Sequence, residues 1–168
     1  MEIEFRGKAV RDEIFFNHTI HKGEWVYGYL SKIYNDSHEL ITVISCEVAV
    51  GEENGHSITD YISIEVDPKT VGQYTGIKDK NGKKIYYHDF VLKRTHNSPK
   101  KTCIVVYRNG GFVATEQTSD DDAYTLRDRN IEVIGNTTDN PSLYCLKLSM
   151  AKLENNSNDY WVDAPYDN

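Results

Sequence analysis

Short runs of β-branched and aromatic residues, each ended by a turn-forming residue, recur along most of the chain. Residues 25–30, Trp-Val-Tyr-Gly-Tyr-Leu, place three aromatic rings on one face of an extended strand and Val26 and Leu30 on the other. Both faces of that strand are apolar, so we expect it to be covered on both sides. Residues 40–46 repeat the pattern, and no long apolar stripe of helical period competes with it. These features predict an all-β fold with short helical turns only.

The expected strands are bounded by Gly, Asn, Asp or Ser, and the sequence predicts them at residues 3–8, 24–32, 40–50, 61–66, 72–78, 83–87, 90–95, 102–108, 112–116 and 131–135. Asn81-Gly82 predicts a type I′ hairpin turn, which needs a positive φ at both central residues. Residues 108–112 predict a second hairpin, residues 52–57 a polar loop, and residues 119–127 the best candidate for a helical turn.

A chain of 168 residues has the length of one domain. We expect a β domain over residues 1–149 and an appendage over residues 150–168, where an Asn/Ser linker precedes the aromatic and acidic residues 160–166. Those rings have no apolar run nearby, so we expect residues 160–166 to dock along a strand edge or on a basic face of the same or another subunit. A disordered terminus is the alternative.

Three features of the sequence indicate the cellular compartment of the protein. The three cysteines are far apart and form no Cys-x-x-Cys pair, which favours free thiols in a reducing cytoplasm over disulfides or a zinc site. No apolar stretch approaches the 18 residues of a membrane-spanning helix. The first six residues lack the apolar core of a secretory signal. The sequence therefore predicts a cytoplasmic protein without a membrane partner.

Signatures of catalysis and cofactor binding are missing from the sequence. It contains no Gly-x-Ser-x-Gly elbow and neither of the two common glycine-rich phosphate loops. His18 and His21 are three residues apart, but a glycine and a strand pattern follow them, so loop histidines are favoured over metal ligands. The acids at 120–122 fit a solvated loop better than a cation site. We therefore expect that the protein is not an enzyme and that it binds neither a metal ion nor a cofactor.

Charge is divided into three blocks. Residues 1–68 carry 5 Lys/Arg against 13 Asp/Glu, residues 69–108 carry 10 against 2, and residues 109–168 carry 4 against 11. One interpretation is that the basic centre packs against the acidic arms, within a chain or between subunits. The other is a nucleic-acid surface. The overall net charge of -7 favours the first.

The basic block also alternates cations with aromatic rings, which is how small barrels bind single-stranded nucleic acids. The residues of this candidate face for a nucleic acid or another partner are Lys83, Lys84, Lys93, Arg94, Lys100, Lys101, Arg108, Tyr86 and Tyr87. The structural alternative is that the rings build the core of a barrel and the lysines coat its rim.

Residues 66–91, containing Val-Gly-Gln-Tyr-Thr-Gly-Ile-Lys-Asp-Lys-Asn-Gly-Lys-Lys-Ile-Tyr, resemble the signature of the YopX family of phage and prophage proteins, as do residues 3–8, 23–29 and 133–143. The signature positions are Gly72, Tyr74, Thr75, Gly76, Asp79, Gly82, Ile85, Tyr86 and Asp89. The resemblance implies a mostly β, oligomeric protein with no assigned catalytic residues. Members usually read Glu-Gly where this chain has Tyr87-His88, so His88 must tolerate a positive φ or the turn differs.

Asp89 follows that turn and is expected to accept backbone N–H bonds that fix a tight corner, as in small SH3-like barrels. We therefore expect a small SH3-like barrel in the central and C-terminal part, augmented by the N-terminal strands. The function expected from these observations is that of a non-enzymatic phage or prophage accessory protein that acts by self-association, as a homo-oligomer, or by partner binding. The alternative is a nucleic-acid-binding module that uses the basic face of residues 69–108.

Overall fold

The computed structural model describes residues 3–15, 18–53, 56–95, 98–116, 123–127 and 130–143. Its strands are β1 (Phe5–Lys8), β2 (Glu13–Phe15), β3 (His18–Ile20), β4 (Trp25–Tyr34), β5 (Leu40–Glu53), β6 (His56–Glu65), β7 (Gly72–Lys78), β8 (Lys84–Tyr86), β9 (Asp89–Thr95), β10 (Ser98–Arg108), β11 (Gly111–Thr115), β12 (Ala123–Thr125) and β13 (Ile131–Asn136). Helical geometry in the described residues is confined to the short 3-10 helix η1 (Pro68–Thr70) and residues 141–143. The all-β prediction is confirmed.

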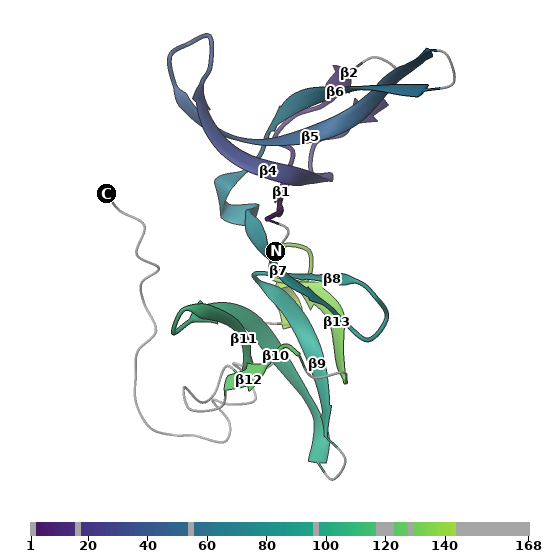
Figure 1. The fold of residues 1–168 in the computed structure, drawn as a ribbon. Coiled ribbons are helices and arrows are strands. Elements are labelled where there is room, and N and C mark those ends of the chain that lie inside the picture. The colour runs from purple at the N-terminus through teal and green to yellow at the C-terminus, as the bar shows by residue number, and fades with distance from the viewer. Residues whose placement is uncertain are drawn as a thin grey trace.

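Hydrogen bonding arranges the described strands in open sheets (Figure 1). One sheet has the order β6-β5-β4-β1-β7-β8, a second has the order β12-β11-β10-β9-β13, and β2 pairs with β3 alone. The strands β7 and β8 belong to the first sheet but lie beside the second in space (Figure 1). The finer expectation of a closed SH3-like barrel stays a prediction.

The first sheet buries one face in a hydrophobic cluster. Alternate residues of β4 and β5 point into it, among them Val26 and Ile44, which are 4% and 0% exposed, and β6 adds Ile64. Phe15 and Ile20 from the β2–β3 hairpin pack against the same cluster. Full burial of one such aliphatic side chain stabilises the fold by about 1.5–3 kcal/mol, so this face fixes how β4, β5 and β6 are oriented.

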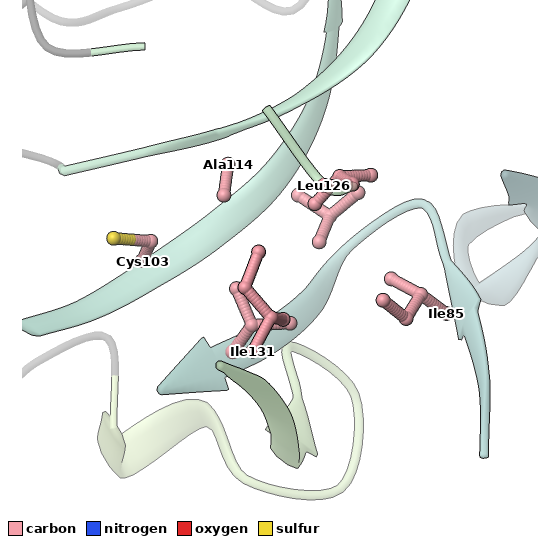
Figure 2. Close-up of a cluster of buried hydrophobic side chains, with 7 residues drawn as sticks. Ile85, Cys103, Ala114, Leu126 and Ile131 are labelled. Carbon is pink, nitrogen blue, oxygen red and sulfur yellow. The ribbon is translucent and has the colours of Figure 1, made fainter. Parts of the chain in front are cut away.

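A second hydrophobic cluster lies within the C-terminal half (Figure 2). Figure 2 shows Ile131 of β13, Cys103 of β10 and Ala114 of β11 in the space between their strands, and all three belong to this cluster. Ile85 of β8 and Leu126, which follows β12, close the cluster, and both are at most 2% exposed. Because β8 hydrogen-bonds to the first sheet and packs into the second core, it connects the two halves.

The second predicted hairpin is confirmed, and the first has a different geometry. Asn109 and Gly110 have φ values of 51° and 81°, as a type I′ turn requires, and Arg108 pairs with Gly111 across it. At the first hairpin only Gly82 has a positive φ, of 82°, so the type I′ prediction at Asn81-Gly82 is wrong. The loop has three residues instead and ends in the left-handed Gly82.

Two further local predictions need correction, and one hairpin was missed. The predicted polar loop at 52–57 is strand on both sides, since Glu52 pairs with Ser57 across a long β5–β6 hairpin. Residues 123–125 form β12, where a helical turn was predicted, because they pair with β11. The β2–β3 hairpin was not predicted. Residues 119–122 and the whole appendage of residues 150–168, with its docking prediction, lie outside the described residues.

Candidate functional site

A buried ion pair joins the two sheets. Arg6 lies on β1 and Asp89 begins β9, and the Arg6 Nη2 donates to Asp89 Oδ1 at 2.6 Å. The two residues are 6% and 0% exposed. The guanidinium is held between the rings of Trp25 and Tyr86, with its central carbon 4.6 Å from each ring centroid. A cation between two aromatic faces gains quadrupole attraction on both sides, so the surroundings stabilise the charge that the pair requires.

Asp89 also fixes the corner before β9, as predicted. The Tyr86 backbone N–H donates to Asp89 Oδ2 at 2.8 Å. His88, at the position where the family usually has glycine, has a φ of 68° and therefore tolerates the left-handed conformation. Its ring stacks on Tyr87 with centroids 3.8 Å apart, and burial lowers the pKa of His88, with a further contribution from Arg6. The corner is thus held by a carboxylate and a stacked ring.

A second buried carboxylate, Asp79, organises the β7–β8 loop. Its Oδ1 accepts the backbone N–H groups of Asn81 and Lys83 at 2.8 and 2.9 Å, and its Oδ2 accepts that of Val133 at 3.0 Å. Burial acts to raise the pKa of Asp79, but these three backbone donors outweigh it and the pKa is lowered. Asp79 therefore ties the loop to β13, a contact that the sequence analysis missed.

The remaining signature residues are structural as well. A Cβ on Gly72 would lie 2.7 Å from the Tyr87 carbonyl oxygen, so only glycine allows this approach. The Thr75 hydroxyl donates to the Ile85 carbonyl at 2.9 Å. Positive φ values occur at Gly76 and Gly82, and Tyr74, Ile85 and Tyr86 are at most 5% exposed. The signature thus encodes the strand pairing and the junction rather than a set of reactive side chains.

Beside the junction, a polar cluster opens to the surface. The Lys84 Nζ pairs with Glu4 Oε2 at 2.6 Å, and the Tyr86 hydroxyl donates to the same carboxylate. Burial raises the pKa of Tyr86, and the Glu4 carboxylate adds to the rise. With Tyr27 and Lys83, these residues line a pocket of about 350 Å³.

The predicted basic face does not form one free cationic surface. Lys84 is paired with Glu4, and the Lys101 Nζ lies 2.6 Å from Glu116 Oε1, a hydrogen bond that raises the pKa of Lys101. The Nζ of Lys93 lies 3.7 Å from the Tyr124 ring centroid. Outside the predicted face, Lys80 of the same basic block pairs with Glu132 at 2.5 Å.

The remaining residues of that face are divided as well. Tyr86 is buried and Tyr87 is half-buried, whereas Lys83 and Lys100 are exposed, and Arg108 is half-buried. The side chain of Arg94 lies outside the described residues. These contacts join the basic block to both acidic arms within one chain, as the first interpretation of the charge blocks predicted.

The other face of β4, β5 and β6 exposes large apolar side chains. Tyr29 and Tyr61 are 61% and 64% exposed, and Tyr27 and Ile33 are 47% and 42% exposed. The expectation that both faces of the strand at 25–30 would be covered is therefore wrong. In the sequence, apolar residues on both faces predicted two layers of packing. In the structure, one face packs on the core and the other is left open.

The described residues were compared with the requirements for a metal site and for a membrane-spanning helix. No three His, Cys, Asp or Glu side chains among them lie close enough to hold a metal ion. Within the same ranges, no helix has the length and hydropathy needed to span a membrane. His18 is exposed on β3, and the His21 Nδ1 lies 3.9 Å from an exposed Asp12 carboxylate. Cys46 and Cys103 are free thiols.

Comparison with known proteins places the chain in a family. No curated protein matches it. A solved structure, that of protein EF1440 from Enterococcus faecalis, is 19% identical, with 85% of this chain and 98% of that chain covered and a TM-score of 0.42. The family model described as YopX protein matches residues 4–144, which include the ion-pair junction and the whole signature. The chain belongs to the YopX family.

Proposed function

We propose that this protein is a non-enzymatic, cytoplasmic accessory protein of phage or prophage type that acts by self-association through the open face of β4, β5 and β6. The observation that carries the proposal is the concentration of exposed tyrosines on that face. Tyrosine is enriched where proteins bind one another, because its ring supplies apolar area and its hydroxyl tolerates water.

The shape of this face is compatible with packing against the same face of a second copy of the chain. Tyr29 pairs in register with Ser45, and Ser45 pairs with Ser63 on β6, with the two hydroxyl oxygens 2.8 Å apart. The two serines thus form a strip of small residues beside the exposed Tyr29, and Tyr61 projects from the neighbouring row, where it pairs with Glu47. In a two-fold arrangement the rings of one copy can lie over the serine strip of the other, so the surface is complementary to itself.

The size of the face is consistent with the core of an interface. Each tyrosine carries about 200 Å² of side-chain surface, and Tyr27, Tyr29 and Tyr61 leave between 47% and 64% exposed. The three rings therefore offer about 350 Å² per copy. A stable dimer buries about 800 Å² on each partner. These rings would supply nearly half of that area, and polar residues around them would supply the rest.

The charge of the face selects the kind of partner. Among the described residues of β4, β5 and β6 that share the side of Tyr29, the charged ones are Glu47 and Glu65, and Glu65 is paired with Arg11. The lysine of these strands, Lys32, lies on the opposite side because it alternates with Tyr29. Among the described residues of β4, β5 and β6 on this side there is no lysine or arginine, so these three strands offer a polyanion such as a nucleic acid no counter-charge of their own.

Size-exclusion chromatography with light scattering tests the proposal on the full chain. The double variant Tyr29→Ser/Tyr61→Ser removes the two most exposed of these three rings and should elute with the mass of a monomer at concentrations where the wild type is larger. Tyr34→Ser is the matched control, because Tyr34 is 72% exposed on the same strand but alternates to the other side. An oligomer that survives the double variant, or is lost equally in the control, would overturn the proposal.

Nucleic-acid binding by the residue 69–108 face is the competing proposal, supported by the exposed Lys83 at the pocket beside Tyr27. Fluorescence anisotropy with labelled single- and double-stranded DNA and RNA at about 50 mM salt is the test, since phosphate contacts are strongest at low salt. Binding that weakens steeply with salt and is reduced in Lys83→Glu would favour it. No binding at that salt concentration would reject it.

A further inference from the structure

A second open surface lies on the C-terminal half, away from the β4–β6 face. A groove of about 790 Å³ is lined by strand β7, the β10–β11 hairpin and the segment after β12. Its wall includes Tyr87, Tyr107 and Phe112. The Tyr107 and Phe112 rings meet edge to face with centroids 5.2 Å apart, and Phe112 lies 6.5 Å from Tyr87. The groove therefore has a continuous aromatic wall.

The other features of the groove favour an extended peptide. Gly110 and Gly111 line it at the hairpin tip, and a Cβ built on either would meet no atom within 4 Å. A ligand backbone can therefore approach the hairpin closely. Aromatic-lined grooves of this kind accept extended, proline-containing segments, because rings pack against proline and other rings without needing side-chain hydrogen bonds.

The charge of the groove indicates the sign of its ligand. Of the described residues that line it, Arg127 is the charged one, and it is exposed. A single guanidinium is too little to follow the phosphates of a nucleic acid. It is enough to orient a peptide with one or a few carboxylates. The ligand chemistry that fits is an acidic peptide with aromatic residues and proline.

The chain itself carries a segment of this chemistry. Residues 159–167 read Asp-Tyr-Trp-Val-Asp-Ala-Pro-Tyr-Asp, with three aromatic rings, one proline, three acids and no cation. We propose that this segment binds the groove of its own chain, with its rings against Tyr107 and Phe112 and its acids toward Arg127. The proposal does not rest on self-association through the β4–β6 face.

The connecting length permits this contact. The 16 residues between Leu143 and Tyr160 can extend over about 50 Å. Tethering raises the effective concentration of the segment to about 1 mM. An intrinsic dissociation constant of about 0.1 mM would then leave the groove filled in about nine molecules of ten. Weak intrinsic affinity is therefore sufficient.

Tryptophan fluorescence of the full chain tests the proposal. The chain has two tryptophans, so the wild-type spectrum minus that of Trp161→Phe isolates Trp161 and leaves Trp25 unaltered. We expect the Trp161 emission to be blue-shifted relative to a synthetic peptide of residues 158–168. Acrylamide should quench Trp161 at least about twofold less than the peptide, because the bound indole is partly shielded from solvent.

Two groove variants and one control locate the binding surface. Tyr107→Ser and Arg127→Glu alter exposed residues and should move the Trp161 emission toward that of the peptide. Tyr34→Ser, an exposed tyrosine on the other sheet, should leave it unchanged. Replacing Asp159, Asp163 and Asp167 by Lys should release the segment, and combining that change with Arg127→Glu should restore the blue shift.

The tail replacements change no residue of the described ranges, so they keep the test decisive if a groove variant fails to fold. A Trp161 spectrum equal to that of the free peptide in the wild type would overturn the proposal. So would a blue shift that neither groove variant changes. A blue shift that disappears on dilution would assign the contact to a second copy and contradict binding within one chain.

Discussion

Replacing Arg6 should remove a large part of the free energy of unfolding that keeps this protein folded. Arg6→Met keeps the length of the side chain between Trp25 and Tyr86 but removes the cation from the fully buried Asp89 carboxylate, which still accepts the Tyr86 N–H. Breaking a buried ion pair from one side costs about 3–5 kcal/mol. Single domains are stable by about 5–15 kcal/mol in total, so the loss should be visible in any denaturation curve.

Urea denaturation followed by circular dichroism gives the free energy of unfolding, and Arg6→Met/Asp89→Asn completes a double-mutant cycle. The Asp89→Asn amide removes the uncompensated charge. The double variant should therefore lose about 2 kcal/mol less stability than the sum of the losses in the two single variants. Burial raises the pKa of Asp89, and Arg6 opposes that rise. Without Arg6, the carboxyl should therefore protonate at higher pH.

That protonation predicts a pH signature for the variant. An acid whose folded-state pKa lies above its unfolded value destabilises the fold when it is charged, and the loss shrinks as it becomes protonated. The deficit of Arg6→Met should accordingly be smaller at about pH 4.5 than at about pH 7. A loss below about 1 kcal/mol, which is the size of an average substitution, or strict additivity in the cycle would refute the reasoning.

Three further changes isolate single features of the structure, each measured by urea denaturation. Gly82→Val should cost about 1 kcal/mol or more, because a β-branched residue is strained at a φ of 82°, whereas Gly111→Val, also in open space, should cost less than half as much; equal losses would contradict this. Gly28→Ala should cost about 3 kcal/mol, since its Cβ would lie 2.1 Å from the Ser45 carbonyl oxygen, and Gly51→Ala, with no atom within 4 Å, is its control. Desolvation acts to raise the pKa of Asp139, but hydrogen bonds from Asn136, Lys8 and Trp25 outweigh it and lower the pKa to about 2. Its stabilisation of the fold is therefore present above the ordinary pKa of 3.8 and is lost as the pH falls from 3.8 toward about 2. Because its side chain is 38% exposed, solvent screening reduces that contribution to about 1 kcal/mol, and an Asp139→Asn variant with the same acid profile as the wild type would exclude it.

Local signals predicted the strands well, and they failed where a side chain competes with the backbone. Asn81-Gly82 and Asn109-Gly110 are the same dipeptide, yet the type I′ geometry that was predicted for Asn81-Gly82 occurs only at Asn109-Gly110. Asp79 lies two residues before Asn81, and its carboxylate accepts the Asn81 and Lys83 N–H groups, which favours a longer loop at Asn81-Gly82. The turn-fixing role of Asp89 was predictable because it depends on neighbours three residues away.

The contacts that define the site join residues far apart in the chain. Arg6 and Asp89 are 83 positions apart, and Glu4 and Lys84 are 80 apart, so no periodicity relates them. Block charges indicated that such pairs should exist but could not assign partners. The exposure of Tyr29 could not be predicted either. Alternation along a strand shows which residues share a face, but it does not show whether another layer of the protein covers that face.

Self-association through an apolar face can be tested directly on the unmodified protein. Sedimentation equilibrium of the wild-type protein over a dilution series, at low and high salt, measures this without a variant. We expect a mass above that of the 19.3 kDa monomer, which falls on dilution and is maintained or increased by salt, since apolar burial is not screened. A monomer at all concentrations would contradict it, as would an oligomer that salt dissociates.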